Sequence, residues 1–272
     1  MTINDWLLSA QKQLKAAKIS TARLDSLVLL EDQLRLDRAY LLAHDDAELS
    51  PENQAALASQ LSRRESHEPL AYIRGFSEFY GRNFVVNKHV LEPRPESETI
   101  ITLLKQLSPN AKLIADIGTG SGALAITAKL ELPHAEVSAI DIDEECLNVV
   151  QINAALHGVN IAYAKGNLLE PFWQSESNMQ PDVLLCNLPY VPTEHPINDA
   201  AKHEPALALF GGQDGLDLYR TLFDQLKNLP TKPALIITES LPDQHAELKS
   251  LAAQHGYTEQ TSEDFIQAFV TS

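Results

Sequence analysis

A glycine-rich turn between an apolar run and a helical segment constrains the fold of this chain more than any other feature. The apolar run at residues 113–117 leads into the turn, and the helix-forming residues 123–127 follow it. Glycine allows a tight turn and lets a ligand approach the main chain closely. Such turns bind nucleotide-like ligands at the carboxyl ends of strands in α/β proteins. We therefore expect a cofactor loop formed by Gly118, Thr119, Gly120, Ser121 and Gly122.

The rest of this region alternates between two patterns. Helical segments separate strand-like apolar runs at residues 113–117, 136–140, 161–164, 183–186 and 234–238. Parallel strands covered by helices on both faces read as continuous apolar runs of this kind. The sequence therefore predicts an α/β fold, with a doubly wound and mostly parallel sheet.

The first quarter of the chain follows a different pattern. From residue 4 to about residue 67 the apolar residues recur at helical spacing, which predicts a small helical bundle. Aromatic and β-branched residues then surround Gly81 between Phe76 and Val86, a pattern that indicates a β-hairpin. We expect a helical domain at residues 1–73, a hairpin linker at 74–93 and a catalytic domain at 94–272.

The charge of the chain argues against a nucleic-acid partner. The sequence has 21 basic and 37 acidic side chains, for a formal net charge of -16. Residues 1–73 hold 8 basic and 11 acidic side chains, which leaves 13 basic and 26 acidic for residues 74–272. Proteins that bind nucleic acid neutralise phosphates with clustered Lys and Arg. We therefore expect no direct contact with DNA or RNA.

Other sequence signals concern location and metal binding. No uninterrupted apolar segment approaches the roughly 20 residues needed to span a bilayer, and the N-terminus lacks a basic stretch followed by an apolar one. Cys146 and Cys186 have no disulfide or metal-site spacing, and the nine histidines show no ligand spacing. We expect a cytoplasmic protein with buried, reduced cysteines, no membrane contact and no metal.

Residues beyond the glycine turn indicate an adenosyl cofactor. The turn has the spacing G-x-G-x-G, which departs from the dinucleotide pattern G-x-G-x-x-G. Asp141 follows Gly118 by 23 residues and ends the second strand, where its carboxylate accepts hydrogen bonds from both ribose hydroxyls. Asn167 and Leu168 follow the third strand, and we expect them beside the adenine, with Asn167 facing the exocyclic amine. Asp116 either lies near the cofactor's ammonium group or caps the amides of the turn.

The four residues Asn187-Leu188-Pro189-Tyr190 directly follow the apolar run 183–186 and predict the chemistry. A conjugated nitrogen attacks a methyl group only once it has begun to pyramidalise, and fixed acceptors for its N–H groups promote this. The Asn187 side-chain oxygen and the Leu188 carbonyl are the predicted acceptors. Pro189 stiffens the turn and Tyr190 stacks on the planar group. Alignment with a sulfonium methyl then predicts methyl transfer to an amide or amino nitrogen.

These four residues form the predicted substrate-binding element. Asn187, Pro189 and Tyr190 are the predicted catalytic residues, and Asn187 is expected to contact the cofactor as well. Glu239, at the end of the fifth strand-like run, either lines the site or is solvated. No general base is evident, and an amide that is being methylated loses its proton to water without one.

Several further segments carry a resemblance to a known family. They are residues 68–73 (EPLAYI), 78–82 (EFYGR), 93–96 (PRPE), 204–209 (EPALAL) and 211–217 (GGQDGLD). With the glycine turn and residues 187–190, they extend over nearly the whole chain. The chain resembles the HemK/PrmC family of methyltransferases.

The resemblance implies a class I S-adenosylmethionine-dependent fold with a seven-stranded sheet and an N-terminal helical domain that helps to dock the substrate. It implies methylation of the side-chain amide nitrogen (N5) of the glutamine in the Gly-Gly-Gln motif of peptide chain release factors, an event in translation termination. By position, residues 118–122, Asp141 and Leu168 are similar to the family's cofactor residues. Residues 187–190 are similar to its glutamine-binding element.

The chain departs from the family pattern at several positions. Leu188 stands where the family usually has proline, so the turn is expected to lose one φ constraint. Asn167 stands where aspartate is usual. Gly211-Gly212-Gln213 reproduces the substrate motif, and we interpret it as a coincidence in a loop that only forms a turn.

Four alternatives remain at this stage. Asn-Leu-Pro-Tyr is also the form found in rRNA adenine N6-methyltransferases, although these need a basic surface for RNA. A related enzyme that methylates a glutamine of a ribosomal protein is a closer alternative, but the segment at residues 93–96 favours release factors. A catalytically silent docking protein is a third. A nicotinamide-dependent dehydrogenase is the fourth, and the glycine spacing disfavours it.

Overall fold

The chain forms two compact units, which we call the helical unit and the sheet unit. The computed structural model describes residues 1–174 and 180–272. The helical unit comprises residues 1–75 and 197–203, and the sheet unit comprises residues 76–196 and 204–272. The short segment 197–203, which lies beyond the tetrapeptide in the sequence, therefore belongs with the N-terminal helices. Within the described ranges, no helix combines the length and apolar character needed to cross a membrane.

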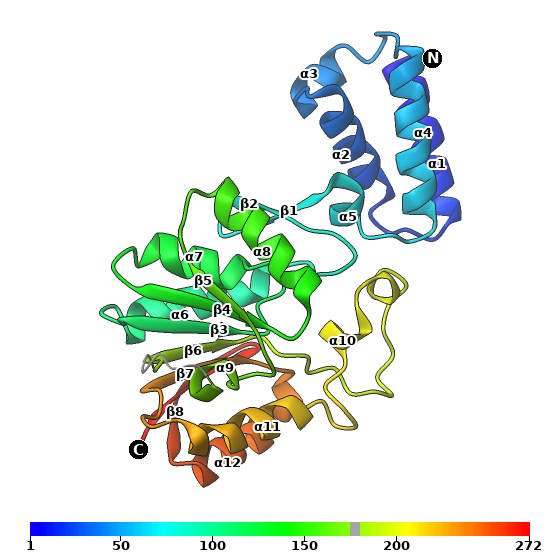
Figure 1. Cartoon of the computed structure of the whole chain (residues 1–272). Helices are drawn as coiled ribbons and strands as arrows, with labels where there is room; N and C mark the ends of the chain where they lie inside the picture. Colours follow the sequence, from blue (N-terminus) through cyan, green and yellow to red (C-terminus); the bar gives the residue numbers. More distant parts are fainter. Residues whose placement is uncertain (175–179) are drawn as a thin grey trace. The chain divides into compact units, whose positions relative to one another are not determined.

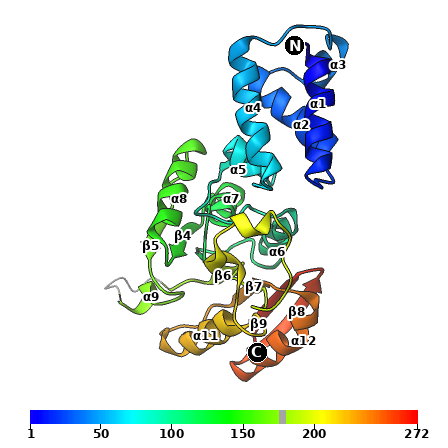
Figure 2. The same ribbon diagram turned by 90° about the vertical axis from the view of Figure 1, so that its right-hand side faces the viewer.

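Five helices build most of the helical unit, as Figure 2 shows. Side chains at three helix starts accept a hydrogen bond from a backbone N–H: those of Thr2, Asp37 and Ser50. Thr21 occupies the N-cap position of α2, but its hydroxyl donates to Asp25 instead of capping the helix. The helices are α1 (Ile3–Ala16), α2 (Ala22–Leu34), α3 (Arg38–Ala43), α4 (Pro51–Glu65) and α5 (Leu70–Arg74).

The helical unit has its own apolar core. Leu14, Leu30 and Leu57 are fully buried at its centre, as the helical spacing in the sequence predicts. Asp25 is also buried, and the Arg64 guanidinium pairs with its carboxylate at 2.7 Å. This pair joins α2 to α4 and satisfies a charge that is costly to bury alone.

The predicted hairpin is present at the start of the sheet unit. Strands β1 (Phe76–Phe79) and β2 (Arg82–Val85) pair antiparallel. Tyr80 and Gly81 form the two-residue turn with φ of 52° and 70°, the positive values that tight hairpins require. Phe79 and Phe84 are buried in the core of the sheet unit.

A seven-stranded sheet dominates this unit, in the order β5-β4-β3-β6-β7-β9-β8. Neighbouring strands from β5 to β7 are parallel, and β9 runs antiparallel to both β7 and β8. This is the predicted mostly parallel, doubly wound sheet. The strands are β3 (Leu113–Ile117), β4 (Glu136–Asp141), β5 (Ala162–Lys165), β6 (Val183–Cys186), β7 (Leu235–Glu239), β8 (Tyr257–Glu263) and β9 (Ile266–Thr271).

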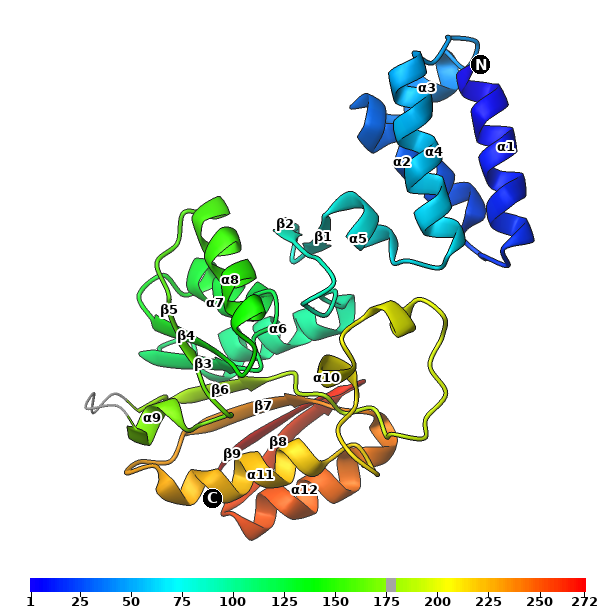
Figure 3. The same cartoon turned by 45° about the vertical axis from the view of Figure 1, so that its right-hand side comes forward.

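Helices cover both faces of the sheet. In Figures 1 and 3, α6, α7 and α8 lie on one face, and α11 and α12 lie on the other. A few short 3-10 segments, including Pro95–Ser97 before α6, complete the connections. The helices of this unit are α6 (Glu98–Leu107), α7 (Ala123–Glu131), α8 (Glu144–Leu156), α9 (Pro171–Gln174), α10 (Ala206–Leu209), α11 (Asp217–Gln225) and α12 (His245–Gln254).

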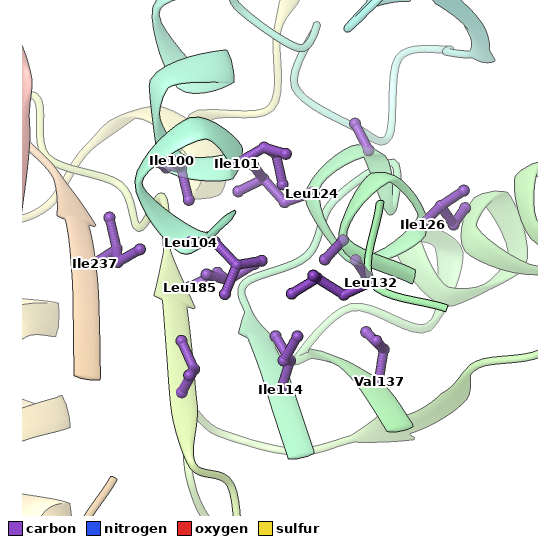
Figure 4. Packing of buried hydrophobic residues seen from close by; sticks show 14 of the residues in the cluster. Ile100, Ile101, Leu104, Ile114, Leu124, Ile126, Leu132, Val137, Leu185 and Ile237 are labelled. Carbon is purple, nitrogen blue, oxygen red and sulfur yellow. The ribbon is translucent and has the colours of Figure 1, made fainter. Parts of the chain in front are cut away.

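Each central strand contributes to two apolar cores. In β6, Leu185 packs in the core beneath α6 and α7, whereas Leu184 packs in the core beneath α11 and α12. Figure 4 shows the first of these cores, in which Ile100 and Leu104 of α6 lie over Leu185 and Ile237 of the sheet. Because both faces are covered, every residue of β6 is buried, which explains why the strand reads as an unbroken apolar run.

The sheet order places the carboxyl ends of β3 and β6 at a topological switch point. From β3 the chain proceeds to β4 on one side, and later to β6 on the other. Ile117 of β3 is in register with Cys186 of β6, so Gly118 and Asn187 leave the sheet side by side. Ligands of open α/β sheets bind in the crevice formed at such a point.

Asn153 of α8 connects the hairpin to the glycine turn. Its side chain is fully buried. Its Oδ1 accepts from the Val85 amide at 2.7 Å, and its Nδ2 donates to the Val85 carbonyl at 3.0 Å and to the Ser121 carbonyl at 2.8 Å. One amide side chain thus satisfies three backbone groups, two of Val85 and one of the buried Ser121.

Asn153→Ala should lower the free energy of unfolding of the sheet unit by about 3 kcal/mol, because it takes away the partner of all three backbone groups. Asn148→Ala, at an exposed position of the same helix, should change it by less than about 0.5 kcal/mol. Trp6 and Trp173 lie in different units. Urea unfolding followed by Trp173 fluorescence in a Trp6→Phe background measures the sheet unit alone, and equal effects of the two substitutions would contradict the connection.

Candidate active site

A cavity at the carboxyl ends of the central strands brings most of the predicted site residues together. Its empty volume, counted out to the open mouth, is about 1120 Å³. Gly122 of the turn and Tyr190 of the tetrapeptide do not line it, and neither do Asp116 and Glu239. The predicted residues that do are Gly118, Thr119, Gly120, Ser121, Asp141, Asn167, Leu168, Asn187, Leu188 and Pro189.

The glycine turn adopts a conformation that depends on its glycines. Gly118, Gly120 and Gly122 have φ of 70°, 54° and 80°, values that other residues rarely adopt. The Gly120 amide donates to Asp141 Oδ2 at 2.9 Å, and the Asp143 amide donates to Asp141 Oδ1 at 2.9 Å. Each carboxylate oxygen keeps a further lone pair for a ligand. The predicted ribose residue therefore braces the turn and faces the cavity.

Asp116 holds the turn through the Thr119 side chain and the start of α7, and not through the amides of the turn, as the second of its two predictions had it. Its Oδ2 accepts from the Thr119 hydroxyl at 2.6 Å and from the Ala125 amide at 3.1 Å. The carboxyl is 1% exposed and does not line the cavity. Its Oδ1 has no partner among the described residues. Burial raises the pKa of Asp116 to about 7.

Gln225 of α11 holds the loop after β5. Leu168 has a φ of 58°, unusual for a side chain of its size. The Gln225 side chain accepts from the Leu169 amide at 2.8 Å and donates to the Asn167 carbonyl at 3.3 Å. It therefore holds the backbone on both sides of Leu168. This contact keeps Leu168 on the wall of the cavity, and sequence reasoning missed Gln225.

The Asn187 amide is held in one orientation. Its Nδ2 donates to Ser97 Oγ at 3.0 Å, and the Ser97 hydroxyl donates to Glu239 Oε2 at 2.5 Å. Among the described residues, no donor reaches Asn187 Oδ1 or the Leu188 carbonyl. Both residues line the cavity, and neither predicted acceptor has a partner among the described residues.

Glu239 corrects one of the sequence interpretations. It is 1% exposed, so it is not a solvated strand end. Its Oε1 accepts from the Tyr190 hydroxyl at 3.0 Å, and its Oε2 accepts from Ser97. Burial raises the pKa of Glu239, while both hydroxyls lower it. Because both oxygens are engaged and the residue does not line the cavity, Glu239 is not placed as a general base.

Leu188 compensates for the proline expected at its position. Unlike proline it has an N–H, which donates to the Tyr219 hydroxyl at 3.4 Å. Its side chain is buried, and a Cβ on Gly118 would lie 3.0 Å from its Cδ2. A hydrogen bond and side-chain packing therefore hold the turn in place of the lost φ constraint.

The loop that contains Gly211-Gly212-Gln213 does more than form a turn, contrary to the sequence interpretation. A Cβ on Gly211 would lie 2.2 Å from the Pro189 carbonyl oxygen, and one on Gly215 would lie 2.1 Å from the Tyr190 carbonyl oxygen. The Gln244 side chain donates to that Tyr190 oxygen at 2.8 Å. The glycines therefore let this loop press directly against the backbone of the tetrapeptide.

Arg94 connects the segment before α6 to the loop after the tetrapeptide. Its guanidinium donates to both carboxylate oxygens of Glu204, at 2.6 and 2.8 Å. The Glu204 side chain is 1% exposed and that of Arg94 is 38% exposed. Since burial of an unpaired carboxylate is costly, this pair ties the two segments together.

Comparison with known proteins defines the class. The family model described as the methyltransferase small domain matches residues 97–203. A solved ribosomal protein L11 methylase from Lactobacillus delbrueckii subsp. bulgaricus has the same fold, with a TM-score of 0.50 at 19% identity over 69% of this chain and 83% of that one. The protein is a methyltransferase with the class I fold.

Closer relatives define the family. The PrmC N-terminal domain model matches residues 5–75. The release factor glutamine methyltransferase of Koribacter versatilis (strain Ellin345) is 37% identical over 231 residues, 83% of this chain and 81% of the relative. That of Bacillus anthracis is 36% identical over 235 residues, 84% and 82% of the two chains. The chain belongs to the family of release factor glutamine methyltransferases.

The buried carboxyl of Asp116 should make stability depend on pH. Its pKa is about 7 in the native protein against 3.8 ordinarily, so native Asp116 keeps a proton that the unfolded chain releases. Between these values, rising pH lowers the free energy of unfolding by up to about 1.4 kcal/mol per pH unit.

Asp116→Asn removes this contribution. Wild type should therefore lose stability relative to the variant as the pH rises from 5 to 7, with the difference levelling off above 7. Urea unfolding at each pH measures it, and Asp243→Asn at an exposed position controls for the loss of a surface carboxylate. A difference that does not change with pH would show that Asp116 is ionised throughout.

Proposed function

We propose that this protein transfers a methyl group from S-adenosylmethionine to the side-chain amide nitrogen (N5) of a glutamine in a peptide chain release factor. The observation that carries the proposal is a pair of acceptors without partners among the described residues, Asn187 Oδ1 and the Leu188 carbonyl. They follow the end of β6, which is in register with the end of β3, where the glycine turn begins. The names of the curated relatives support the substrate.

The residues around the cavity fit S-adenosylmethionine. Asp141 keeps lone pairs for the two ribose hydroxyls, and the glycine turn lets the ligand approach the main chain. Leu168 and Ile142 supply apolar walls for an adenine ring, with Asn167 beside its exocyclic amine. When bound, the cofactor supplies a methyl group on a positively charged sulfur, which is electrophilic.

The chain's own part of the reaction is to orient the nucleophile. Asn187 Oδ1 and the Leu188 carbonyl accept the two N–H groups of the glutamine carboxamide. Fixed acceptors favour the nitrogen as it pyramidalises and gains positive charge, because they meet a charge that develops only in the transition state. Pro189 restricts the turn that carries them. The lost proton leaves to water.

The charge of the chain and its helical unit favour a protein substrate over a nucleic acid. A formal charge of -16 does not suit a phosphate backbone, so we assign no direct nucleic-acid contact and no membrane contact. The helical unit matches the PrmC N-terminal domain, and we propose that it docks the release factor. We place the protein in the cytoplasm, and its two buried free cysteines are compatible with that reducing compartment.

The proposed activity should appear as methyl transfer from labelled S-adenosylmethionine to a release factor. A factor whose Gly-Gly-Gln glutamine is changed to alanine should accept no label, because no other residue presents a carboxamide at that site. Scintillation counting and mass spectrometry of the glutamine-containing peptide measure the transfer. Equal labelling of both factors, or none of either, would refute the proposed substrate.

Asn187→Ala should lower kcat by about 10²-fold or more, since it removes one of two acceptors that act in the transition state. The Kd for S-adenosylmethionine should stay within a few fold, measured by calorimetry. Asn228→Ala, at an exposed site of the same unit, is the matched control. Undiminished transfer by Asn187→Ala would remove Asn187 from its proposed role.

A further inference from the structure

The hydroxyl of Ser97 decides which atom of the Asn187 amide faces the cavity. A serine hydroxyl has one proton to donate and oxygen lone pairs to accept with. Its proton goes to Glu239 Oε2, so the oxygen is left to accept from Asn187 Nδ2. The amide then presents Oδ1 to the cavity. Had Ser97 donated to Asn187 instead, the amide would turn over and present an N–H group.

Two structural features bring the Ser97 hydroxyl to Glu239. Cys186 of β6 is in register with Thr238 of β7, so Glu239 ends its strand beside Asn187. Ser97 stands at the start of α6, where serine usually caps a helix, yet its side chain makes no capping hydrogen bond. The hydroxyl is thus available to join the two strand ends.

The same carboxylate reaches the far end of the tetrapeptide. Glu239 Oε1 accepts from the Tyr190 hydroxyl, while Oε2 holds Ser97. Ser97 and Glu239 are 3% and 1% exposed, so water does not compete for these bonds. A single buried carboxylate therefore controls both the first and the last residue of the tetrapeptide.

We propose that Glu239, acting through Ser97, is a positioning residue that orients the Asn187 amide so that its oxygen accepts from the substrate carboxamide. This inference rests on the proposed function and extends it to substrate selection. An amide oxygen attracts the N–H groups of glutamine and repels the carboxylate of glutamate. The Glu239–Ser97 pair thereby makes the site selective for a carboxamide.

The test compares Ser97→Ala and Glu239→Gln with wild type. Ser97→Ala removes the acceptor for Asn187 Nδ2. Glu239→Gln keeps the size of the side chain but replaces one acceptor oxygen with an N–H donor. Each should lower kcat for release-factor methylation by ten- to a hundredfold, while the Kd for S-adenosylmethionine stays within about threefold, which also shows that the variants fold. Ser97→Thr keeps the hydroxyl and should recover most of the lost kcat.

Two matched controls separate this role from general packing. Ser240→Ala removes a buried hydroxyl next to Glu239 that has no hydrogen-bond partner among the described residues. Glu247→Gln removes an exposed charge of the same unit that takes no part in the network. Both controls should methylate the factor at the wild-type rate.

A binding measurement tests the orientation directly. With S-adenosylhomocysteine present, wild type should bind a factor carrying glutamine at the Gly-Gly-Gln site at least tenfold more tightly than one carrying glutamate. In Ser97→Ala and Glu239→Gln the amide is free to turn, so this ratio should fall to within about threefold. A merely structural loss would weaken both factors equally.

The outcomes distinguish this inference from the function on which it rests. Failure of wild type to methylate any release factor would remove the proposed function, and this inference with it. Methylation by wild type together with unchanged kcat, or an unchanged glutamine-to-glutamate ratio, in Ser97→Ala and Glu239→Gln would overturn the inference alone.

Discussion

The register of three parallel strands is the constraint on which the site depends. Ile117, Cys186 and Thr238 lie side by side in β3, β6 and β7. The residues that follow leave the sheet at one level: Gly118 begins the cofactor turn, Asn187 begins the tetrapeptide, and Glu239 ends its strand. A shift of one residue in any pair would turn each side chain to the opposite face of the sheet. Backbone hydrogen bonds therefore set the relative positions of the glycine turn, Asn187 and Glu239 before any ligand binds.

The site is built from polar groups in an apolar surrounding, and this explains its rigidity. Both faces of the central strands are covered, so each polar atom at their ends must find a partner in the protein. Asn153, Gln225 and Glu239 each satisfy two or more groups at once. Because few alternative pairings exist in such a place, each network holds one arrangement. Preorganised acceptors of this kind stabilise a transition state without having to reorient during the reaction.

Close packing allows the departure at Leu188 without loss of the turn. The Leu188 N–H, which proline lacks, meets the Tyr219 hydroxyl, and its side chain lies against the backbone of Gly118. Behind the tetrapeptide, Gly211 and Gly215 bring a second loop against the carbonyls of Pro189 and Tyr190. The conformation of the tetrapeptide is therefore held from both sides, and it does not depend on the ring of one proline.

Local patterns in the sequence determined the elements and ten of the residues that line the cavity. Unbroken apolar runs predict strands buried on both faces, and alternating glycines predict a turn of positive φ, because these properties depend on near neighbours in the chain. Asp141, Leu168 and Asn187 were found in this way. The resemblance in motifs supplied the family and the seven-stranded sheet.

Only the tertiary structure decided which distant residues meet. Ser97 and Glu239 are 142 positions apart, and Ser97 and Asn187 are 90 apart. Nothing in the local sequence distinguishes Ser97 from an ordinary helix cap, or Glu239 from a solvated strand end. Burial removed water as a partner for both, so they hydrogen-bond to one another.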